Sequence, residues 1–430
     1  MKASNYNFFY KYRNNCYLIY NSWSNALAIM SNYQYNCFQQ FQADLSYKLD
    51  DKFVNELQKG NFIIEDEVNE LDLIRERMLK YRYNSSTLGL TIAPTLDCNF
   101  RCIYCYEKGC NKNGVMPEEV QNKIIEYIRQ RASTINQLTV TWYGGEPLLA
   151  LEIIENLTNH FLEICYLNNI NYSASIVTNG YLLSSNVAKR LADCKIVNCQ
   201  VTIDGDRETH NIRRPHVMGI DTYDVILHNA FTAGNFFPVA IRVNVDKENI
   251  NAIFSIRKDM DRKGISNVVL YPAPVRVNND CYGENICLNS IEFYEFEYQY
   301  VTSIDDKKAL RRKYPIPRGN SCCADSLNAL VISEDGSLYK CWSDIGRKDL
   351  CIGNIVDGCY NATKAIRYSK YDPTQDRKCS KCKFLPICMG GCPRDVYNRP
   401  EDRCAHIKKI HKMYISRIAL DIEQKENVDA

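Results

Sequence analysis

Three cysteines near residue 100 are spaced like the ligands of an iron–sulfur cluster. Three residues separate Cys98 from Cys102, and two separate Cys102 from Cys105. Thiolates are soft ligands that suit such clusters, which usually take four of them. A four-iron cluster held by three cysteines leaves one iron open, and an open iron can bind a substrate or a cofactor. A zinc site is the alternative, although no second cysteine pair follows at a zinc-finger distance.

A second motif, Gly144-Gly145-Glu146-Pro147, directly follows an apolar stretch at 138–143 that we predict to be a strand. Two glycines let the backbone approach a ligand closely, and the Glu146 carboxylate can accept a hydrogen bond from an ammonium group. Alone, this sequence would indicate an ordinary turn. Because it comes one strand after the cysteine motif, we interpret the two motifs as parts of one site.

Alternating strands and helices are expected around these motifs, between residues 85 and 275. The predicted strands cover 88–93, 138–143, 173–177, 199–203, 239–245 and 268–271, and helices at 117–132, 151–167, 184–192, 222–233 and 249–263 separate them. This order predicts parallel βα units, which place their chemistry in the loops after the strands. Both motifs lie in such loops. Softer candidates are Thr178, Asn179 and Asp204 at strand ends, then His210 and Arg213, and then Arg242 and Asn244 on the fifth predicted strand. Each could instead cap or hydrogen-bond a loop.

The last third of the chain is rich in cysteine. Residues 320–404 hold ten of the 21 cysteines, in a series with the spacing CxxCxxxxxCxxxC at its centre. So many turns and thiols do not fit an ordinary apolar core, so we predict a cluster-binding domain over 320–430 that ends in a helix near 405–422. Two zinc knuckles are the alternative.

Residues 1–84 are predicted to form a small separate module. Short segments rich in aromatic and β-branched residues indicate strands at 8–12, 16–20, 26–30 and 62–65, with helices at 31–43 and 50–58. Such a mixture indicates a compact, winged-helix-like unit. Residues 276–319, with a helix near 290–302, are predicted to bridge the βα region and the cysteine-rich domain.

The bulk composition excludes several classes of function. The formal net charge of the 430 residues is +2 and no basic stripe stands out, so nucleic acid is not an expected partner. No apolar run approaches the roughly 18 residues of a membrane span, and the N-terminus lacks the apolar core of a secretory signal. We therefore expect a cytoplasmic protein, in which so many cysteines indicate metal or redox chemistry.

The first cysteine motif, with Tyr104 inside it, and the Gly144–Pro147 loop resemble the radical S-adenosylmethionine (radical SAM) enzymes. The resemblance implies an α/β fold, a partial (β/α)6 barrel, with the N-terminal winged-helix-like module and a C-terminal iron–sulfur domain beside it. It implies that Cys98, Cys102 and Cys105 hold a [4Fe–4S] cluster whose open iron binds SAM. The residues that it places near SAM are Tyr104, Gly144, Gly145, Glu146, Pro147, Thr178, Asn179 and Asp204.

The C-terminal cysteines resemble the SPASM extension of the same superfamily, which holds auxiliary four-iron clusters. Carried over to this chain, one cluster takes Cys379, Cys382, Cys388 and Cys404. The other takes Cys341, Cys392 and either Cys322 or Cys323. Its fourth ligand stays open: Cys351, Cys359, the second member of the 322/323 pair, or no thiol at all.

The resemblance also implies the reaction. One electron, from a donor such as flavodoxin or ferredoxin, would cleave SAM to methionine and a 5′-deoxyadenosyl radical, which takes a hydrogen atom from an unactivated carbon. With the N-terminal module as a peptide-recognition element, the chain is similar to maturases that form thioether or carbon–carbon cross-links in ribosomally made precursor peptides. The alternatives are an anaerobic sulfatase-maturing enzyme, which forms formylglycine, and a non-catalytic iron–sulfur electron carrier.

Overall fold

The computed structural model describes residues 1–44, 46–107, 114–276, 282–304, 307–398, 404 and 407–426. The chain forms two compact units. The first, which we call the core unit, contains residues 84–289 and 327–368. The second, the cysteine-loop unit, contains residues 1–83, 290–326 and 369–430. This division differs from the four consecutive segments expected from the sequence, because both units are built from parts of the chain that lie far apart.

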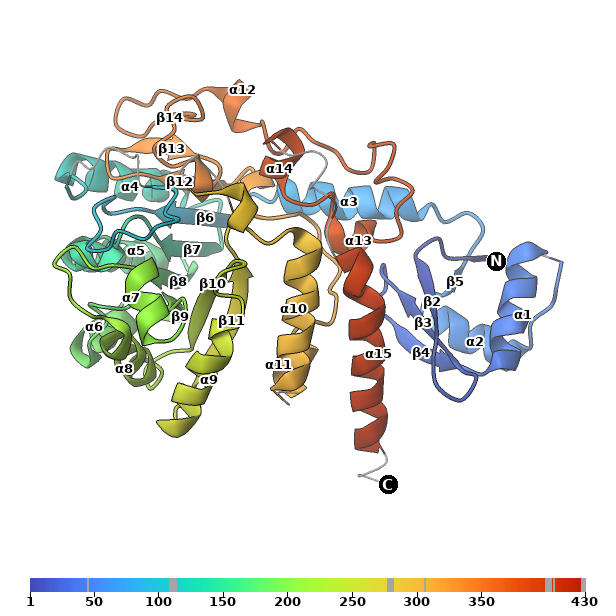
Figure 1. Ribbon diagram of the computed structural model, residues 1–430. Helices are drawn as coiled ribbons and strands as arrows, with labels where there is room; N and C mark the ends of the chain where they lie inside the picture. Colours follow the sequence, from blue (N-terminus) through green and yellow to red (C-terminus); the bar gives the residue numbers. More distant parts are fainter. Residues whose placement is uncertain are drawn as a thin grey trace. The chain divides into compact units, whose positions relative to one another are not determined.

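A nine-stranded sheet forms the centre of the core unit, in the order β11-β10-β9-β8-β7-β6-β12-β13-β14 (Figure 1). Its first six strands are parallel and run in sequential order, which confirms the predicted βα region. They are β6 (Thr87–Ile92), β7 (Gln137–Trp142), β8 (Asn171–Thr178), β9 (Ile196–Thr202), β10 (Val239–Val245) and β11 (Val268–Pro274).

The other three strands of this sheet come from the region expected to belong to the cysteine-rich domain. β12 (Ala329–Ile332) pairs in parallel with β6, and β13 (Ser337–Tyr339) and β14 (Gly353–Asn354) follow in antiparallel order. All four residues of β12 are buried, since the strand lies between two others. Residues 327–368 therefore fold with the core, which corrects the boundary drawn at residue 320.

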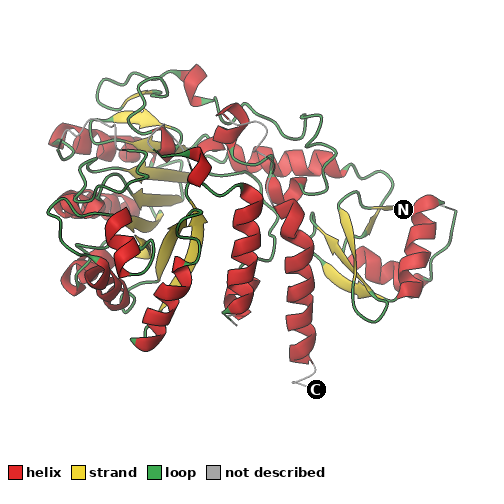
Figure 2. Ribbon diagram, in the orientation of Figure 1, coloured by secondary structure: helices red, strands yellow, loops and turns green. Residues whose placement is uncertain are grey.

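Helices pack along the parallel strands, as the red and yellow elements of Figure 2 show. Each of the five predicted helices is present: α4 (Glu118–Arg131), α5 (Leu151–Leu167), α6 (Ser185–Asp193), α8 (Tyr223–Ala233) and α9 (Ala252–Arg262). Their apolar faces form the core; on α5, Ile154, Leu157 and Phe161 are fully buried. Shorter elements that the sequence did not predict are α7 (Arg207–Arg213), η1 (Pro147–Ala150), η2 (Glu284–Ile286), η4 (Trp342–Asp344) and α12 (Ala362–Ala365).

The N-terminal part of the cysteine-loop unit is a three-stranded antiparallel sheet with helices. The strands β2 (Asn7–Lys11), β3 (Tyr17–Asn21) and β4 (Leu27–Met30) lie in that order, so β2 and β4 form its edges. The remaining elements are α1 (Asn32–Ala43), α2 (Asp51–Lys59), the pair β1 (Lys2–Ala3) and β5 (Ile63–Ile64), and α3 (Glu70–Arg82). The helix α3 was not predicted, because only Ile74 and Met78 mark its buried face.

This sheet packs against the C-terminal helix α15 (Ile407–Glu426), so the N-terminal module is not a separate body as expected. His411 of α15 is fully buried among aromatic rings that include Phe8 and Tyr20, and the hydroxyl of Tyr10 lies 2.6 Å from its Nδ1. The other elements of the unit are α10 (Ser290–Ser303), α11 (Lys307–Arg311), η3 (Cys323–Asp325), α13 (Leu385–Cys388) and α14 (Pro393–Asn398).

Among the residues that the structure describes, no helix is long and apolar enough to cross a bilayer.

One ion pair is buried where three segments of the cysteine-loop unit meet. Arg82, at the end of α3, lies 3.1 Å from the carboxylate of Asp325, and the two side chains are 3% and 0% exposed. Arg82 also donates to the carbonyl oxygens of Ser369 and Tyr371. One guanidinium group thus joins the three segments of this unit, 1–83, 290–326 and 369–430.

Replacing Arg82 with methionine should lower the free energy of unfolding by about 3–5 kcal/mol, because the Asp325 charge would stay buried without its partner. Arg75, on the same helix, forms a half-exposed pair with Asp372. Its replacement, Arg75→Met, should cost less than about 1 kcal/mol. Urea unfolding curves of the two variants and the native protein measure both effects. Equal losses of unfolding free energy in the two variants would show that the buried pair contributes no more to stability than the half-exposed pair.

Candidate functional site

The loop that carries Cys98, Cys102 and Cys105 follows β6, at the carboxyl edge of the parallel strands. Backbone hydrogen bonds join it to the segment after α7: Arg101 donates to Pro215 (2.8 Å) and Ile103 donates to Arg213 (3.1 Å). All three thiols are partly buried. The structure therefore holds them in one ordered loop, which lies where the sequence predicted it.

Burial raises the pKa of each of these three thiols to about 11, and the buried Arg214 guanidinium acts in the opposite direction on all of them. Three thiols thus lie within the field of one buried cation. Arg214 was not predicted as a site residue from the sequence, although it directly follows the candidate Arg213. Burial favours the neutral form of these thiols, but they lose their protons when a metal binds. Three cysteine thiolates are suitable ligands for an iron–sulfur cluster, so the donor set fits one.

No group of three or more histidine, cysteine, aspartate or glutamate side chains among the described residues converges as ligands of a single metal ion would. A four-iron cluster makes a different demand, because each thiolate binds its own iron atom.

The Gly144–Pro147 loop packs directly on the cysteine loop. A Cβ atom on Gly144 would lie 2.4 Å from the carbonyl oxygen of Thr95, and one on Gly145 would lie 2.4 Å from those of Leu96 and Asp97. The backbone of Gly145 donates to Thr95 (3.2 Å). Glycine is required at both positions because no side chain fits between the loops. The two motifs that we interpreted as one site are therefore in contact.

Glu146 has a different environment from the one expected. Its side chain is fully buried and accepts hydrogen bonds from the Thr178 hydroxyl (2.7 Å) and from the backbone N–H groups of Asn179 (2.7 Å) and Leu148 (3.0 Å). Burial raises the pKa of this carboxyl, while these three donors lower it. Glu146 therefore joins the loop after β7 to the end of β8. A carboxylate can accept about four hydrogen bonds, so these three donors hold Glu146 in place, and its predicted contact with an ammonium group stays a prediction.

The other predicted residues gather around the hydroxyl of Tyr104. This hydroxyl donates to the carboxylate of Asp204 and accepts from Arg214 Nη1 (2.7 Å) and Asn244 Nδ2 (3.0 Å). Asn179 lies on the other side of the loop, where its side-chain amide donates to Asn99 (2.7 Å). Residues that follow β6 and β9 thus meet Asn244 of β10 in one hydrogen-bonded network beside the cysteine loop.

A second buried ion pair lies behind this network. Arg213 and Asp246 are 2.5 Å apart and are 5% and 0% exposed. The hydroxyl of Tyr282 also donates to Asp246 (2.5 Å). The sequence analysis named Arg213 but not Asp246, whose one signal is its position directly after β10.

Three aromatic residues that the sequence analysis did not single out extend the site. The hydroxyls of Tyr106 and Tyr143 are hydrogen-bonded, and the ring of Tyr143 stacks on that of Trp342 with centroids 5.4 Å apart. Tyr106 follows Cys105 and Trp342 follows Cys341 in the sequence. The candidate ligand Cys341 therefore belongs to the core unit, and the stacked ring next to it touches the residue that precedes Gly144.

The remaining candidate cysteines lie in the cysteine-loop unit, and the sequence assigns them to two groups. In the first, the hydroxyl of Ser321 donates to the carbonyl oxygen of Gly391, so Cys322 and Cys392 follow two residues that touch. Asp325 accepts from the backbone N–H of Cys322 (3.3 Å) and so shapes this loop. A hydrogen bond with Cys323, together with burial, raises the pKa of Cys322.

The second group contains Cys379, Cys382, Cys388 and Cys404. The hydroxyl of Tyr371 lies 3.4 Å from Cys379 Sγ, and Lys408 Nζ lies 3.9 Å from Cys404 Sγ. The thiols of Cys382 and Cys388 also act on Lys408 electrostatically. One ammonium group therefore interacts with three of the four thiols that are expected to share a cluster.

The loop between Cys382 and Cys388 is attached to the N-terminal sheet. Lys383 Nζ donates to the carbonyl oxygen of Asn7 (2.9 Å), at the start of β2, and the Ser22 hydroxyl donates to the carbonyl of Lys383 (2.5 Å). Phe384 packs edge-on against Phe8. Two hydrogen bonds and a ring contact thus join the sheet to this cysteine loop.

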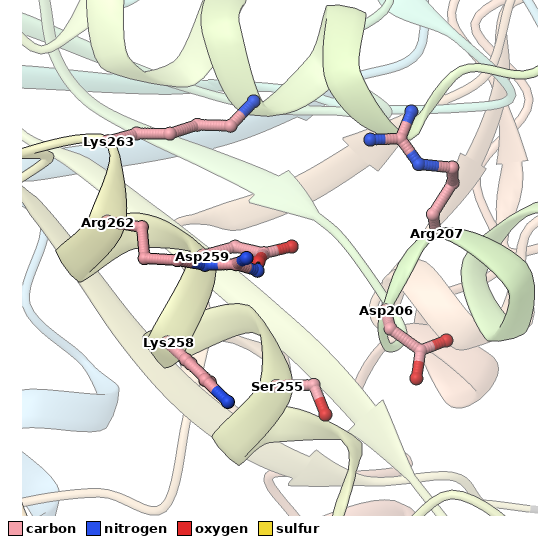
Figure 3. A pocket seen from close by; sticks show the side chains of 7 residues that line it. All are labelled: Asp206, Arg207, Ser255, Lys258, Asp259, Arg262 and Lys263. Carbon is pink, nitrogen blue, oxygen red and sulfur yellow. Dashed lines mark hydrogen bonds and ion pairs between the residues drawn. The ribbon is translucent and has the colours of Figure 1, made fainter.

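A pocket in the core unit lies between the start of α7 and helix α9 (Figure 3). Charged side chains line it, and several are already paired: Arg207 and Lys263 with Asp224, and Arg262 with Asp259. Its lining residues, Asp206, Arg207, Ser255, Lys258, Asp259, Arg262 and Lys263, include none of the predicted site residues.

The buried His210 gives the site a measurable pH dependence. Its Nδ1 accepts from the backbone of Asp204 (3.3 Å), and burial, with Arg214 nearby, lowers its pKa from 6.5 to about 3. A lowered pKa means that stability is lost as the pH falls from 6.5 toward 3. Between about pH 7 and about pH 5.5 this one group should lower the free energy of unfolding by about 1.3 kcal/mol.

Urea unfolding at these two pH values should therefore show a smaller pH dependence for His210→Gln than for the native protein. The matched control is His228→Gln, the same change at an exposed position on α8. If His210→Gln kept the full native dependence, the buried imidazole would not be its source.

Comparison with known proteins agrees with this geometry. Residues 92–259 match the radical SAM superfamily. A cysteine-type anaerobic sulfatase-maturating enzyme of Clostridium perfringens is 25% identical over 337 residues, which cover 71% of this chain and 89% of the relative. The radical SAM cyclopropyl synthase TigE of Paramaledivibacter caminithermalis is 23% identical over 380 residues, which cover 79% of this chain and 75% of the relative.

Two solved structures share the fold. Native anSMEcpe with bound AdoMet superposes with a TM-score of 0.60 at 21% identity, over 79% of this chain and 99% of that one. Streptococcus suis SuiB bound to its precursor peptide SuiA superposes with a TM-score of 0.53 at 14% identity, over 94% of this chain and 98% of that one. Enzymes of the superfamily use a [4Fe–4S] cluster and SAM. The chain thus contains a radical SAM domain, which includes both the cysteine loop and the glycine loop packed against it.

Proposed function

We propose that this protein is a radical SAM maturase that introduces a thioether or carbon–carbon cross-link into a ribosomally made precursor peptide. The observation that carries the proposal is the attachment of the N-terminal sheet to the Cys382–Cys388 loop through Lys383. A peptide held on that sheet would be bound to the same body as a predicted cluster. An external one-electron donor of the flavodoxin or ferredoxin kind is part of this proposal.

In the core unit, Cys98, Cys102 and Cys105 would hold the SAM-binding cluster. When bound, the cluster and SAM supply a carbon-centred radical that can take hydrogen from an unactivated carbon. The protein holds the loops of the site in a fixed arrangement and excludes water from it. The close contact of Gly144 and Gly145 with the cysteine loop fixes both loops, and the buried network around Tyr104 keeps polar groups oriented without water.

In the cysteine-loop unit, Cys379, Cys382, Cys388 and Cys404 would hold an auxiliary cluster. Cys392 and either Cys322 or Cys323 would be ligands of the other. The Ser321–Gly391 contact supports the pairing of Cys322 with Cys392, and the position of Lys408 supports the grouping of Cys382, Cys388 and Cys404. Ligands drawn from distant parts of the chain close long loops, which a bound cluster stabilises.

For peptide recognition we propose the outer edge of β4. The sheet order leaves β4 paired with β3 alone among the described strands, and Ile29 on it is 43% exposed. An extended peptide can add to such an edge through main-chain hydrogen bonds. The likeness to SuiB, whose structure holds its precursor peptide, supports this layout. The superposition covers 94% of this chain. The remaining 6% is much shorter than residues 1–83, so most of these residues are included in the superposition.

The second candidate is a sulfatase-maturing enzyme that converts a cysteine to formylglycine. The 25% identity with the Clostridium perfringens enzyme favours it. The anSMEcpe superposition covers a smaller share of this chain than that of SuiB, 79% against 94%. We therefore place it second, and the product distinguishes the two candidates.

The cysteine variants should separate two functions of the protein. Replacing Cys98, Cys102 or Cys105 with alanine should abolish SAM cleavage, because the SAM-binding cluster loses a ligand. Replacing Cys388 should spare SAM cleavage and stop modification of the peptide. Anaerobic assays of deoxyadenosine, with mass spectrometry of the peptide, measure both.

With the native enzyme and the right precursor, the peptide should lose about two hydrogens per cross-link. A formylglycine product would establish the sulfatase-maturing activity instead, and an absence of SAM cleavage would leave an electron carrier. If Cys388→Ala still formed the native amount of product, that auxiliary cluster would have no catalytic role.

Peptide binding should depend on β4. Ile29→Asp places a charge on the proposed docking strand and should weaken binding of the precursor by at least about tenfold, while SAM cleavage stays at its native rate. The control is Leu73→Asp, which adds the same charge at a similarly exposed position on α3. Fluorescence anisotropy with a labelled precursor measures both. Equal affinities for the two variants would locate the peptide elsewhere.

A further inference from the structure

Lys408 is the residue of α15 that faces the predicted second group of cysteine ligands. Its Nζ lies 3.9 Å from Cys404 Sγ, within hydrogen-bonding range of sulfur, and it interacts with the Cys382 and Cys388 thiols as well. These sulfur atoms come from two segments, the 379–392 loop and the chain just before α15. Lys408 is therefore the cation that the fold brings to this group of thiols.

Lys408 brings a positive charge close to the sulfur atoms of this group. Its Nζ lies 3.9 Å from Cys404 Sγ. A lysine ammonium group is charged at neutral pH. A charged group at this distance from sulfur ligands acts on whatever charge they carry.

Reduction of a four-iron cluster adds one electron and therefore one negative charge to the cluster and its thiolates. A fixed positive charge nearby stabilises the reduced form more than the oxidised form. Hydrogen bonds to the sulfur atoms act in the same direction and are among the factors that set the potentials of such clusters.

We propose that Lys408 is a positioning residue that tunes the auxiliary cluster held by Cys379, Cys382, Cys388 and Cys404. Its ammonium group donates to the ligand sulfurs and makes this cluster easier to reduce. The electron comes from a low-potential one-electron donor, and the cluster is the only group reduced in the step. This inference rests on the proposed function, because it needs a cluster at these four cysteines.

The test is a potentiometric titration, followed by electron paramagnetic resonance, of full-length protein reconstituted anaerobically and reduced with dithionite. The background variant Cys98→Ala/Cys102→Ala/Cys105→Ala removes the signal of the SAM-binding cluster. In this background, Lys408→Gln should move the midpoint potential of one auxiliary cluster to a more negative value. Lys408→Arg, which keeps the charge, should stay near the native value.

Lys412→Gln is the matched control. Lys412 lies one turn further along α15 and its side chain is exposed, so the same loss of charge there should leave the potential unchanged. A native midpoint in Lys408→Gln would overturn the inference. So would an equal loss of iron from Lys408→Gln and Lys408→Arg, because the fit of the side chain, not its charge, would then matter.

Failure of the underlying proposal gives a different result. If Cys379→Ala and Cys388→Ala kept the full native iron content, no cluster would be held by this group of thiols, whatever residue stands at position 408. Iron analysis of these two variants therefore separates the two questions.

Discussion

The loops after β6 and β7 lie so close together that no side chain fits between them. A Cβ atom on Gly144 or Gly145 would clash with the carbonyl groups of residues 95–97, so only glycine fits at these two positions. This contact fixes the cysteine loop relative to the sheet, since the β7 loop is itself anchored to β8 through Glu146. The positions of the three thiols follow from that chain of contacts, and a residue larger than glycine at either position would move them.

Buried charge is the second constraint on the core unit. Asp204 and Arg214 are both buried and act on the same tyrosine hydroxyl, and Arg213 is paired with Asp246 just behind them. Such groups are costly to bury unless each finds a partner. Here each charge finds a partner from another βα loop. The polar network therefore orders the loops at the site as well as lining it.

Regular parts of the fold could be predicted from the sequence because their signal is local. The strand at 239–245 was predicted at the bounds that it has in the structure, since its apolar and β-branched residues stand between clear breaks. Six strands separated by amphipathic helices then left only a parallel sheet. The helix α7 carries no apolar repeat, and therefore nothing in its own sequence marked it.

The site was predicted where a motif carries it and missed where distant residues create it. The cysteine and glycine motifs are contiguous, so each could be read directly. Arg214 and Trp342 have no such pattern; they belong to the site because the loop after α7 and the turn after β13 happen to meet it. Glu146 lies in a recognised motif, but the sequence did not indicate that Thr178 and Asn179 at the end of β8 would donate to its carboxylate.

The path of the chain has a practical meaning for dissecting this protein. It leaves the core after residue 289, returns as β12 to pair with β6, and departs again after residue 368. No single cut separates the two units. A fragment ending near residue 289 would leave β6 as a bare sheet edge of unpaired backbone groups, open to pairing with other copies. Expressed fragments of this enzyme would then precipitate for a topological reason, whatever their chemistry.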